Sequence, residues 1–219
     1  RTPIIFIHGV GLDHSIWDPQ INEFDNTVLI YDILGHGKTP LNKNDLSFDD
    51  FSDQIINLID ELKFNKVHLV GFSIGSLIAR NFATRFNNRL ASLTLLCSIF
   101  NRSDKEQKIV NDRFEQTKKD HKLTKDALKR WFTEDFLNKN PDISDKIFTI
   151  LQNNNMNNFI KIYSLFVKHQ DNEKFENINT KTLVITGEGD VGSTPEMSIN
   201  LGKKIKNSVV KIIPKGKHL

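Results

Sequence analysis

The sequence predicts an α/β fold in which a mostly parallel β-sheet carries helices on both faces and has a helical segment inserted into it. Short runs rich in β-branched and apolar residues alternate with amphipathic segments over residues 1–100 and again over 178–219. Between them, residues 101–177 contain only helical periodicity. Strands that alternate with helices normally lie parallel in one sheet that the helices cover.

Each strand is expected where a β-rich run ends in turn-forming residues. The strands predicted in this way are 4–7, 27–31, 66–70, 90–97, 182–186 and 209–213. Helices are predicted over 48–62, 74–86 and 195–206. The first of these has apolar side chains three and four residues apart, and the last begins at Ser193-Thr194-Pro195, a sequence that suits a helix start.

The middle of the chain is predicted to be a helical cap. Residues 1–100 and 178–219 would form the core, and 101–177 the insertion, which is rich in Lys, Asp, Asn and Phe. A chain of 219 residues is long enough for one compact domain with one inserted subdomain. Apolar residues recur at helical spacing in the insertion at Trp131, Phe132, Phe136, Ile147, Ile150, Leu151, Phe159, Ile162 and Phe166.

The composition is that of an ordinary globular protein, with 38% hydrophobic and 26% charged residues. The formal charge of +3 is small and its cations are dispersed, so a nucleic-acid partner is not expected. No apolar run approaches the roughly 20 residues of a membrane span, so a membrane is not expected as a partner, and no signal-peptide pattern is present. The single cysteine, Cys97, excludes an internal disulfide and favours a reducing, cytoplasmic location.

The motif that carries the chemistry is Gly71-Phe72-Ser73-Ile74-Gly75, which matches G-x-S-x-G between a predicted strand and a predicted helix. In that context the sharp turn lifts the serine hydroxyl out of the sheet. Glycines on either side give room, because a β-carbon there would collide with the neighbouring strand and helix. We therefore predict Ser73 to be a nucleophile.

A serine hydroxyl needs a base to take its proton, and His218 is the best candidate. It follows the last predicted strand at the carboxyl edge of the sheet, where open α/β sheets hold their ligands. The other histidines are less suitable. His8 precedes a glycine at the end of the first predicted strand, His36 is expected in a surface turn, and His68 lies inside a predicted strand. No strand-end placement is expected for His14, His121 and His169.

The imidazole in turn needs a carboxylate that fixes its tautomer. Asp190, just beyond a predicted strand, is favoured, with Glu188 and Asp104 as alternatives. An oxyanion hole is expected from the backbone amides of Val10 and Ile74, because Ile7-His8-Gly9-Val10 ends a strand with a glycine and Ile74 follows the nucleophile.

Taken together, these motifs resemble the α/β-hydrolase superfamily. Besides the serine turn, the resemblance is carried by His8-Gly9, by residues 32–39 (Asp-Ile-Leu-Gly-His-Gly-Lys-Thr), by Gly187-Glu188-Gly189-Asp190 and by Gly216-Lys217-His218. Within the superfamily the chain is most similar to the 3-oxoadipate enol-lactonase and carboxylesterase group, on Gly9-Val10-Gly11-Leu12-Asp13, Trp17-Asp18-Pro19 and Thr194-Pro195-Glu196-Met197. The resemblance implies an eight-stranded sheet under a helical cap.

The sequence departs from this pattern in its length. Members usually have two strands before the His-Gly segment and a helix after the catalytic histidine, and we expect both to be truncated here. Ser76 and Thr39 also stand where many relatives have glycine and serine.

The predicted reaction is hydrolysis of a small-molecule carboxylic ester or lactone through an acyl-enzyme, with no metal and no organic cofactor. Trp131, Phe136 and Phe159, with Phe132 and Phe166, are candidates for an apolar substrate pocket, although each of them could instead pack the cap helices onto the sheet. Two alternatives stay open: a carbon–carbon bond hydrolase with the same triad, and a non-catalytic ligand-binding protein of the same fold. The sequence does not indicate an oligomeric state.

Overall fold

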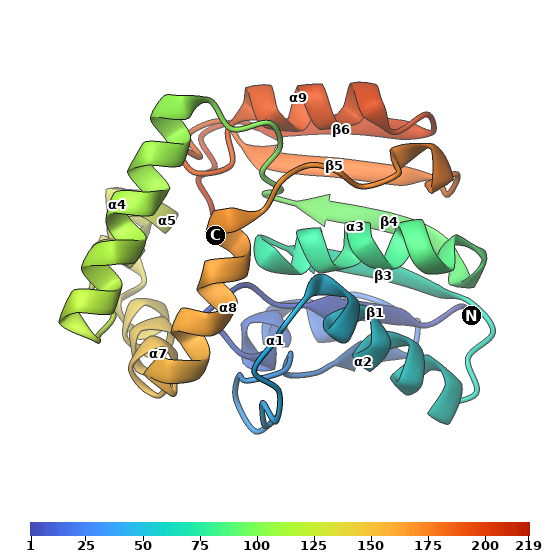
Figure 1. Cartoon of the computed structure of the whole chain (residues 1–219), viewed down its shortest axis with the longest axis horizontal. Helices are drawn as coiled ribbons and strands as arrows, with labels where there is room; N and C mark the ends of the chain where they lie inside the picture. Colours follow the sequence, from blue (N-terminus) through green and yellow to red (C-terminus); the bar gives the residue numbers. More distant parts are fainter.

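The computed structural model describes all 219 residues and contains one six-stranded sheet (Figure 1). The strand order is β2-β1-β3-β4-β5-β6, and every neighbouring pair is parallel. The sheet has six strands and not the eight implied by the resemblance. The strands are β1 (Ile4–Ile7), β2 (Val28–Ile30), β3 (Val67–Phe72), β4 (Leu90–Leu96), β5 (Thr182–Gly187) and β6 (Ser208–Ile213).

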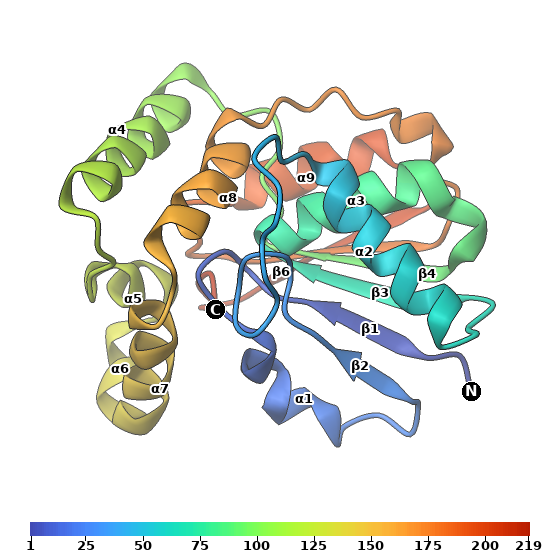
Figure 2. The same ribbon diagram turned by 60° about the horizontal axis from the view of Figure 1, so that its bottom comes forward.

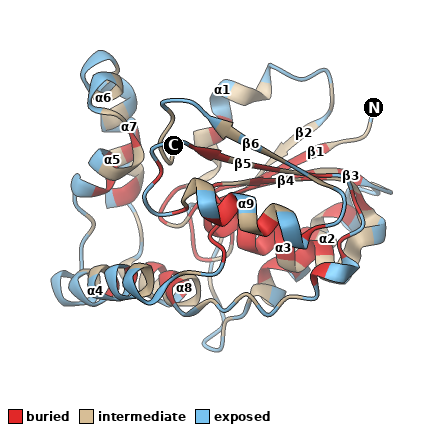
Figure 3. Ribbon diagram, turned by 90° about the horizontal axis from the view of Figure 1, so that it is seen from above, coloured by how far each residue is buried: buried red, intermediate tan, exposed pale blue.

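One face of the sheet is covered by three helices, α2 (Phe48–Glu61), α3 (Ile74–Phe86) and α9 (Pro195–Lys204), which lie side by side in Figure 3. Helix α2 begins with a capping box in which Ser47 and Asp50 satisfy each other's backbone amides. The apolar sides of these helices and the inward residues of the strands form the largest hydrophobic core. The predicted amphipathic pattern of this layer is confirmed.

The other face is covered unevenly. Near β1 and β2 it packs on the 3-10 helix η1 (His14–Trp17) and the short helix α1 (Asp18–Ile21), which the sequence analysis did not predict. Near the carboxyl ends it packs on inserted helices through Ala127, Leu128 and Leu151. At the far edge β6 is bare on this side, so that the Val209 side chain is 66% exposed. Helices therefore lie on both faces, as predicted, but the edge at β6 carries them on one face only.

Between β4 and β5 the chain forms five helices that lie beyond the carboxyl ends of the strands (Figures 1 and 2). The carboxyl terminus at Leu219 lies beside these helices, whereas the amino terminus lies at the opposite end of the sheet. None of the helices of the chain is both long and apolar enough to span a membrane. The five inserted helices are α4 (Asp104–Asp120), α5 (Asp126–Trp131), α6 (Glu134–Lys139), α7 (Pro141–Gln152) and α8 (Met156–Lys168).

The start and end of this insertion are fastened to the core by a buried arginine. Arg80 on α3 is fully buried, and its guanidinium binds Asp171 and Glu173, which follow α8, at 2.7 Å each. The same guanidinium donates to the carbonyl of Ile99 at 2.8 Å, and Asp171 accepts the amide of Asn101 at 2.6 Å. Burial would raise the pKa of Asp171, but its bonds to His169 and Arg80 outweigh burial and lower it.

Replacing Arg80 by methionine is expected to destabilise the protein by about 3–5 kcal/mol, because Asp171 and Glu173 would remain buried without their cation. Arg85→Met, on the same helix but with exposed acidic partners, is expected to cost at most about 1 kcal/mol. Urea unfolding at pH 7 measures both. Similar losses in the two variants would contradict the role assigned to Arg80.

Candidate active site

Ser73 lies at the turn between β3 and α3 in strained backbone geometry. Its φ is 55° and its ψ is −118°, a combination that residues other than glycine rarely adopt. A β-carbon on Gly71 would lie 2.2 Å from the carbonyl oxygen of Gly75, and one on Gly75 would lie 2.6 Å from that of Ile7. The collisions predicted from the sequence are therefore present, and only glycine lets the strand, the turn and the helix approach this closely.

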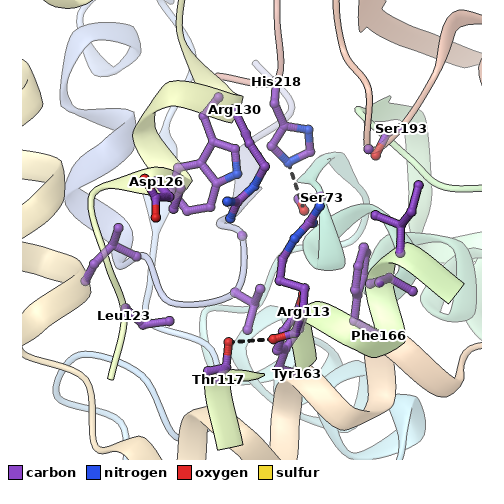
Figure 4. A pocket seen from close by; sticks show the side chains of 18 of the residues that line it. Ser73, Arg113, Thr117, Leu123, Asp126, Arg130, Tyr163, Phe166, Ser193 and His218 are labelled. Carbon is purple, nitrogen blue, oxygen red and sulfur yellow. Dashed lines mark hydrogen bonds between the residues drawn. The ribbon is translucent and has the colours of Figure 1, made fainter. Parts of the chain in front are cut away.

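The structure brings the three predicted side chains together although they are far apart in the sequence. His218 Nε2 lies 3.2 Å from Ser73 Oγ, the contact drawn in Figure 4. On the other side of the ring, Nδ1 lies 2.7 Å from Asp190 Oδ2. The ring sits beside Phe72, with centroids 5.0 Å apart. This geometry lets Nδ1–H donate to the carboxylate while Nε2 faces the serine hydroxyl as an acceptor.

The backbone of His218 is also held in place. Its amide donates to the carbonyl of Trp131 at 3.0 Å, and its own carbonyl accepts the Cys97 thiol at 3.2 Å. His218 is thereby connected to the inserted helix α5 on one side and to the end of β4 on the other.

Asp190 is buried and uses both carboxylate oxygens. Oδ2 faces His218, and Oδ1 accepts the amides of Gly192 and Ser193 at 2.8 and 2.9 Å. The two alternatives lie elsewhere: Glu188 accepts the amide of Lys215 at 3.0 Å, and Asp104 lies in the first turn of α4. Of the three candidates, only Asp190 contacts the histidine.

Asp190 and His218 shift each other's proton affinity in opposite directions. Burial would raise the pKa of Asp190, but the hydrogen bonds from His218, Ser193 and Gly192 outweigh burial and lower it. Burial would lower the pKa of His218, but the hydrogen bond to Asp190 and its negative charge raise it above the usual 6.5. Asp190 therefore increases the basicity of the imidazole.

The amides of Val10 and Ile74 were predicted to form an oxyanion hole, and both are available as donors. Val10 lies in the loop after β1, outside any helix or strand, and its N–H has no acceptor within the chain. Ile74 is the first residue of α3, a position whose amide has no partner inside a helix. Val10 also lines the cavity in front of Ser73.

Two further histidines hold the loops that follow β1 and β2. His36 Nε2 accepts the amide of Gly11 at 2.8 Å, and His8 Nε2 accepts the amide of Ile33 at 3.0 Å. Both rings are buried, so the expectation that His36 occupies a surface turn was wrong. Burial lowers the pKa of His8 to about 4 and, together with the nearby His8, that of His36 to about 3, so both accept hydrogen bonds as neutral rings.

Asp32 organises the same loops. Its carboxylate accepts the amide and the ring N–H of His14, at 2.9 and 2.7 Å, and the amide of Lys38 at 3.0 Å. Gly37 has a φ of 52°, and a β-carbon there would lie 2.2 Å from Asp32 Oδ2. The segment 32–39 contributed to the resemblance, but the sequence did not indicate what Asp32 and His36 bind.

A cavity of about 350 Å³ opens in front of Ser73 and His218, bounded by the inserted helices. Of the predicted pocket residues, Trp131 and Phe159 line it, as does Phe166. Phe136 does not, which corrects that expectation: its ring stacks on Phe132 at a centroid distance of 4.9 Å, within the hydrophobic cluster of the inserted helices.

Two groups of side chains have donor atoms close enough together to consider a metal ion. The first is Cys97, Asp190 and His218, but both ring nitrogens of His218 already face partners. The second is His169, Asp171 and Glu173, where the guanidinium of Arg80 lies within 2.7 Å of both carboxylates and its charge would repel a cation. Neither donor set suits a metal.

The fold and this geometry are those of an α/β hydrolase, a class in which a serine turn, a histidine and an acid meet at the carboxyl edge of a parallel sheet. Residues 2–219 match the family model of the alpha/beta hydrolase fold, so the chain belongs to this family, and the resemblance seen in the sequence is confirmed at that level.

Comparison of the sequence and the structure with known proteins finds similar hydrolases. The chain is 29% identical to (E)-2-((N-methylformamido)methylene)succinate hydrolase of Acinetobacter baylyi, over 99% of this chain and 83% of that protein. It is 26% identical to 3-oxoadipate enol-lactonase 1 of the same organism, over 87% and 72%. An esterase from Exiguobacterium antarcticum has the same fold, with a TM-score of 0.89 at 18% identity, over 100% of this chain and 85% of that one.

The two buried neutral histidines are expected to make stability fall as the solution becomes acidic. Between pH 6.5 and about 4 the unfolded chain protonates His8 and His36 whereas the folded chain does not. Each histidine should therefore lower the free energy of unfolding by about 1.4 kcal/mol per pH unit in that window. His36→Gln should reduce this slope by about the contribution of one histidine, as measured by urea unfolding at pH 7, 6 and 5.

The matched control is His121→Asn, because His121 is exposed at the end of α4. This variant should keep the slope of the unmodified protein. An unchanged slope in His36→Gln would show that the His36 ring is not kept neutral by its surroundings.

Proposed function

We propose that the protein is a serine hydrolase that cleaves a small-molecule carboxylic ester or lactone, with Ser73, His218 and Asp190 as its catalytic triad. The observation that carries this proposal is the continuous contact from Asp190 through both nitrogens of one imidazole to a strained serine. The names of the similar proteins, an enol-lactonase and an esterase among them, support the same reaction class.

In the acylation step, His218 Nε2 takes the proton of Ser73 as Oγ attacks the carbonyl carbon of the substrate. Asp190 holds the ring in the tautomer with hydrogen on Nδ1 and stabilises the imidazolium that forms. The proton then passes from His218 to the leaving alcohol oxygen as the carbon–oxygen bond breaks. The products of this step are the alcohol and an ester of Ser73.

In the deacylation step, a water molecule takes the place of the alcohol and gives a proton to His218 as it attacks the acyl-serine carbonyl. His218 then returns this proton to Ser73 Oγ as the ester bond breaks and the carboxylic acid leaves. In both steps the amides of Val10 and Ile74 donate to the oxygen that becomes negative. A donor of this kind is worth roughly 2.7–4 kcal/mol in well-studied enzymes. The His36–Gly11 hydrogen bond holds the loop that presents the Val10 amide.

We assign helices α4 to α8 to a cap over the site, which corresponds to the insertion 101–177. The cap contributes Trp131, Phe159 and Phe166 to the cavity wall, so it determines which acyl and alcohol groups fit. A cavity of about 350 Å³ suits a small molecule.

Ser73→Ala is expected to lower kcat for p-nitrophenyl acetate by roughly a thousandfold or more, because the acyl-enzyme no longer forms. The unmodified protein should be labelled by a fluorophosphonate at one serine per chain. Ser144→Ala, on α7 and away from the cavity, should keep both properties. Equal turnover by the Ser73→Ala and unmodified proteins, both shown to be folded by circular dichroism, would refute the proposal.

The pH dependence should reflect the Asp190–His218 pair. Because the base acts when neutral, kcat/KM should rise with pH and level off above an apparent pKa higher than 6.5, the direction in which Asp190 moves His218. Asp190→Asn should shift the rise in kcat/KM to lower pH, since the charge that stabilises the imidazolium is lost. It should also reduce kcat by a factor of about 10⁴.

Glu188→Gln is the control for this experiment, because Glu188 lies in the same loop and binds the Lys215 amide instead of the histidine. Its pH profile should match that of the unmodified protein. If kcat/KM rises at the same pH in Asp190→Asn as in the unmodified protein, Asp190 is excluded as the partner of the base.

A further inference from the structure

Three arginines line the cavity that contains Ser73. Arg102 precedes α4, Arg113 lies on α4 and Arg130 lies on α5. Figure 4 shows the side chains of Arg113 and Arg130 extending into the cavity, with the end of Arg113 beside Ser73. Arginine is mostly exposed in proteins and, where it is buried, normally has an acceptor or an anion as its partner.

Arg113 and Arg130 are unlike the other arginines because their guanidinium groups have no partner. Neither forms a hydrogen bond or an ion pair within the chain; the one contact involving a side chain at Arg113 is made by its backbone carbonyl, which accepts the Thr117 hydroxyl. Every other arginine donates to a side-chain or backbone oxygen. These are Arg1, Arg80, Arg85, Arg89 and Arg102.

Arg102 forms a fixed part of the wall behind this pair. Its guanidinium donates to the carbonyls of Phe166 and Val167 at 3.0 and 3.2 Å and lies over the Phe166 ring, 4.5 Å from the centroid. Its other terminal nitrogen, Nη2, is buried without a partner. Burial lowers the pKa of Arg102 to about 10.

Three of the acidic residues of the cavity wall, Glu106, Asp120 and Asp126, bind other partners. Glu106 accepts the amide and hydroxyl of Ser103, both at 2.7 Å, and so caps α4. Asp120 accepts the Gln116 amide at 2.8 Å, and Asp126 accepts the Thr124 hydroxyl at 3.3 Å. No ion pair joins any of these carboxylates to Arg113 or Arg130; Asp126 lies instead 3.9 Å from the Lys129 ammonium.

The two cations also disfavour each other. Burial lowers the pKa of Arg130, and the positive charge of Arg113 lowers it further. An anion bound between them would offset both the lost hydration and the repulsion. A carboxylate is suited to this position, because its two oxygens match the two parallel N–H donors of a guanidinium.

We propose that Arg113 and Arg130 form a carboxylate-binding subsite, so that the substrate cleaved at Ser73 is an ester or lactone that carries a free carboxylate. This inference rests on the hydrolase function proposed above. The carboxylate would fix the far end of the substrate and leave the scissile carbonyl in front of the serine, which is how a remote charge contributes to positioning.

Binding tests the subsite without requiring hydrolysis. Ser73→Ala protein, which cannot turn over an ester, is titrated calorimetrically with glutarate and with glutaramide, its uncharged analogue. Glutarate should bind at least about tenfold more tightly, and Arg113→Gln or Arg130→Gln in the same background should weaken it by roughly 10- to 100-fold. Equal binding of the two compounds, or glutarate binding that survives both substitutions, would overturn the inference.

Catalysis tests whether the subsite serves the reaction. The monomethyl esters of succinate, glutarate and adipate are compared with the corresponding esters in which a carboxamide replaces the free carboxylate. For at least one chain length kcat/KM should favour the carboxylate by at least about tenfold. The ratio of kcat/KM for the carboxylate ester to that for the carboxamide ester should fall toward one in Arg113→Gln and Arg130→Gln. It should be partly kept in Arg130→Lys, which retains the charge but not the two parallel N–H donors.

Arg85→Gln is the matched control, since Arg85 binds Asp49 and Asp53 and lies outside the cavity. It should keep the full preference. Hydrolysis of the carboxylate and carboxamide esters at equal rates would overturn the carboxylate subsite and leave the hydrolase proposal standing. Selective glutarate binding without hydrolysis of any ester would overturn the hydrolase proposal and leave the carboxylate-binding site standing.

Discussion

The close approach of β1, β3 and α3 at the Ser73 turn is the constraint on which the rest of the site depends. Two positions in this turn, Gly71 and Gly75, have backbone atoms where a β-carbon would have to lie. Ser73 itself is held by its amide, which donates to the carbonyl of Leu96 on β4 at 2.9 Å. Because the serine is fixed by three neighbouring strands and a helix, the histidine and the loop after β1 can be placed against a rigid reference.

Around this turn, buried histidines differ in proton affinity according to their partners. His8 and His36 accept amides, which requires a neutral ring, and burial keeps them neutral. His218 is also buried, yet the negative charge of Asp190 raises its pKa. One residue type thus supplies both the fixed acceptors that hold the loops after β1 and β2 and a ring whose affinity for a proton is raised. The difference between these roles comes from a single carboxylate.

Much of the core could be predicted from the sequence because its signals are local. All six strands and helices α2, α3 and α9 lie within a few residues of the predicted bounds, since β-rich runs, apolar spacing and caps depend on neighbours in the chain. The proximity of Ser73, Asp190 and His218 was predictable for a related reason: each follows a strand, and parallel strands end at one edge.

The features that could not be predicted depend on contacts between distant segments. The partner of His36 is an amide 25 positions away in another loop, and nothing near His36 in the sequence indicates it. Arg80 resembles an exposed residue until the acids after α8 are seen beside it. Phe136 was assigned to the pocket because helical spacing shows that a side chain is buried but not which element it packs against.

The hydrogen bond from the His218 amide to the Trp131 carbonyl has a consequence for how this protein can be altered or recombined. The backbone of His218 is bound to the helical layer that lines the cavity, so the two cannot be exchanged as independent modules. Transplanting α5 from another hydrolase would displace the imidazole as well as reshape the cavity. Changes in substrate range therefore have to preserve the path of the backbone at residue 131, whatever side chain it carries.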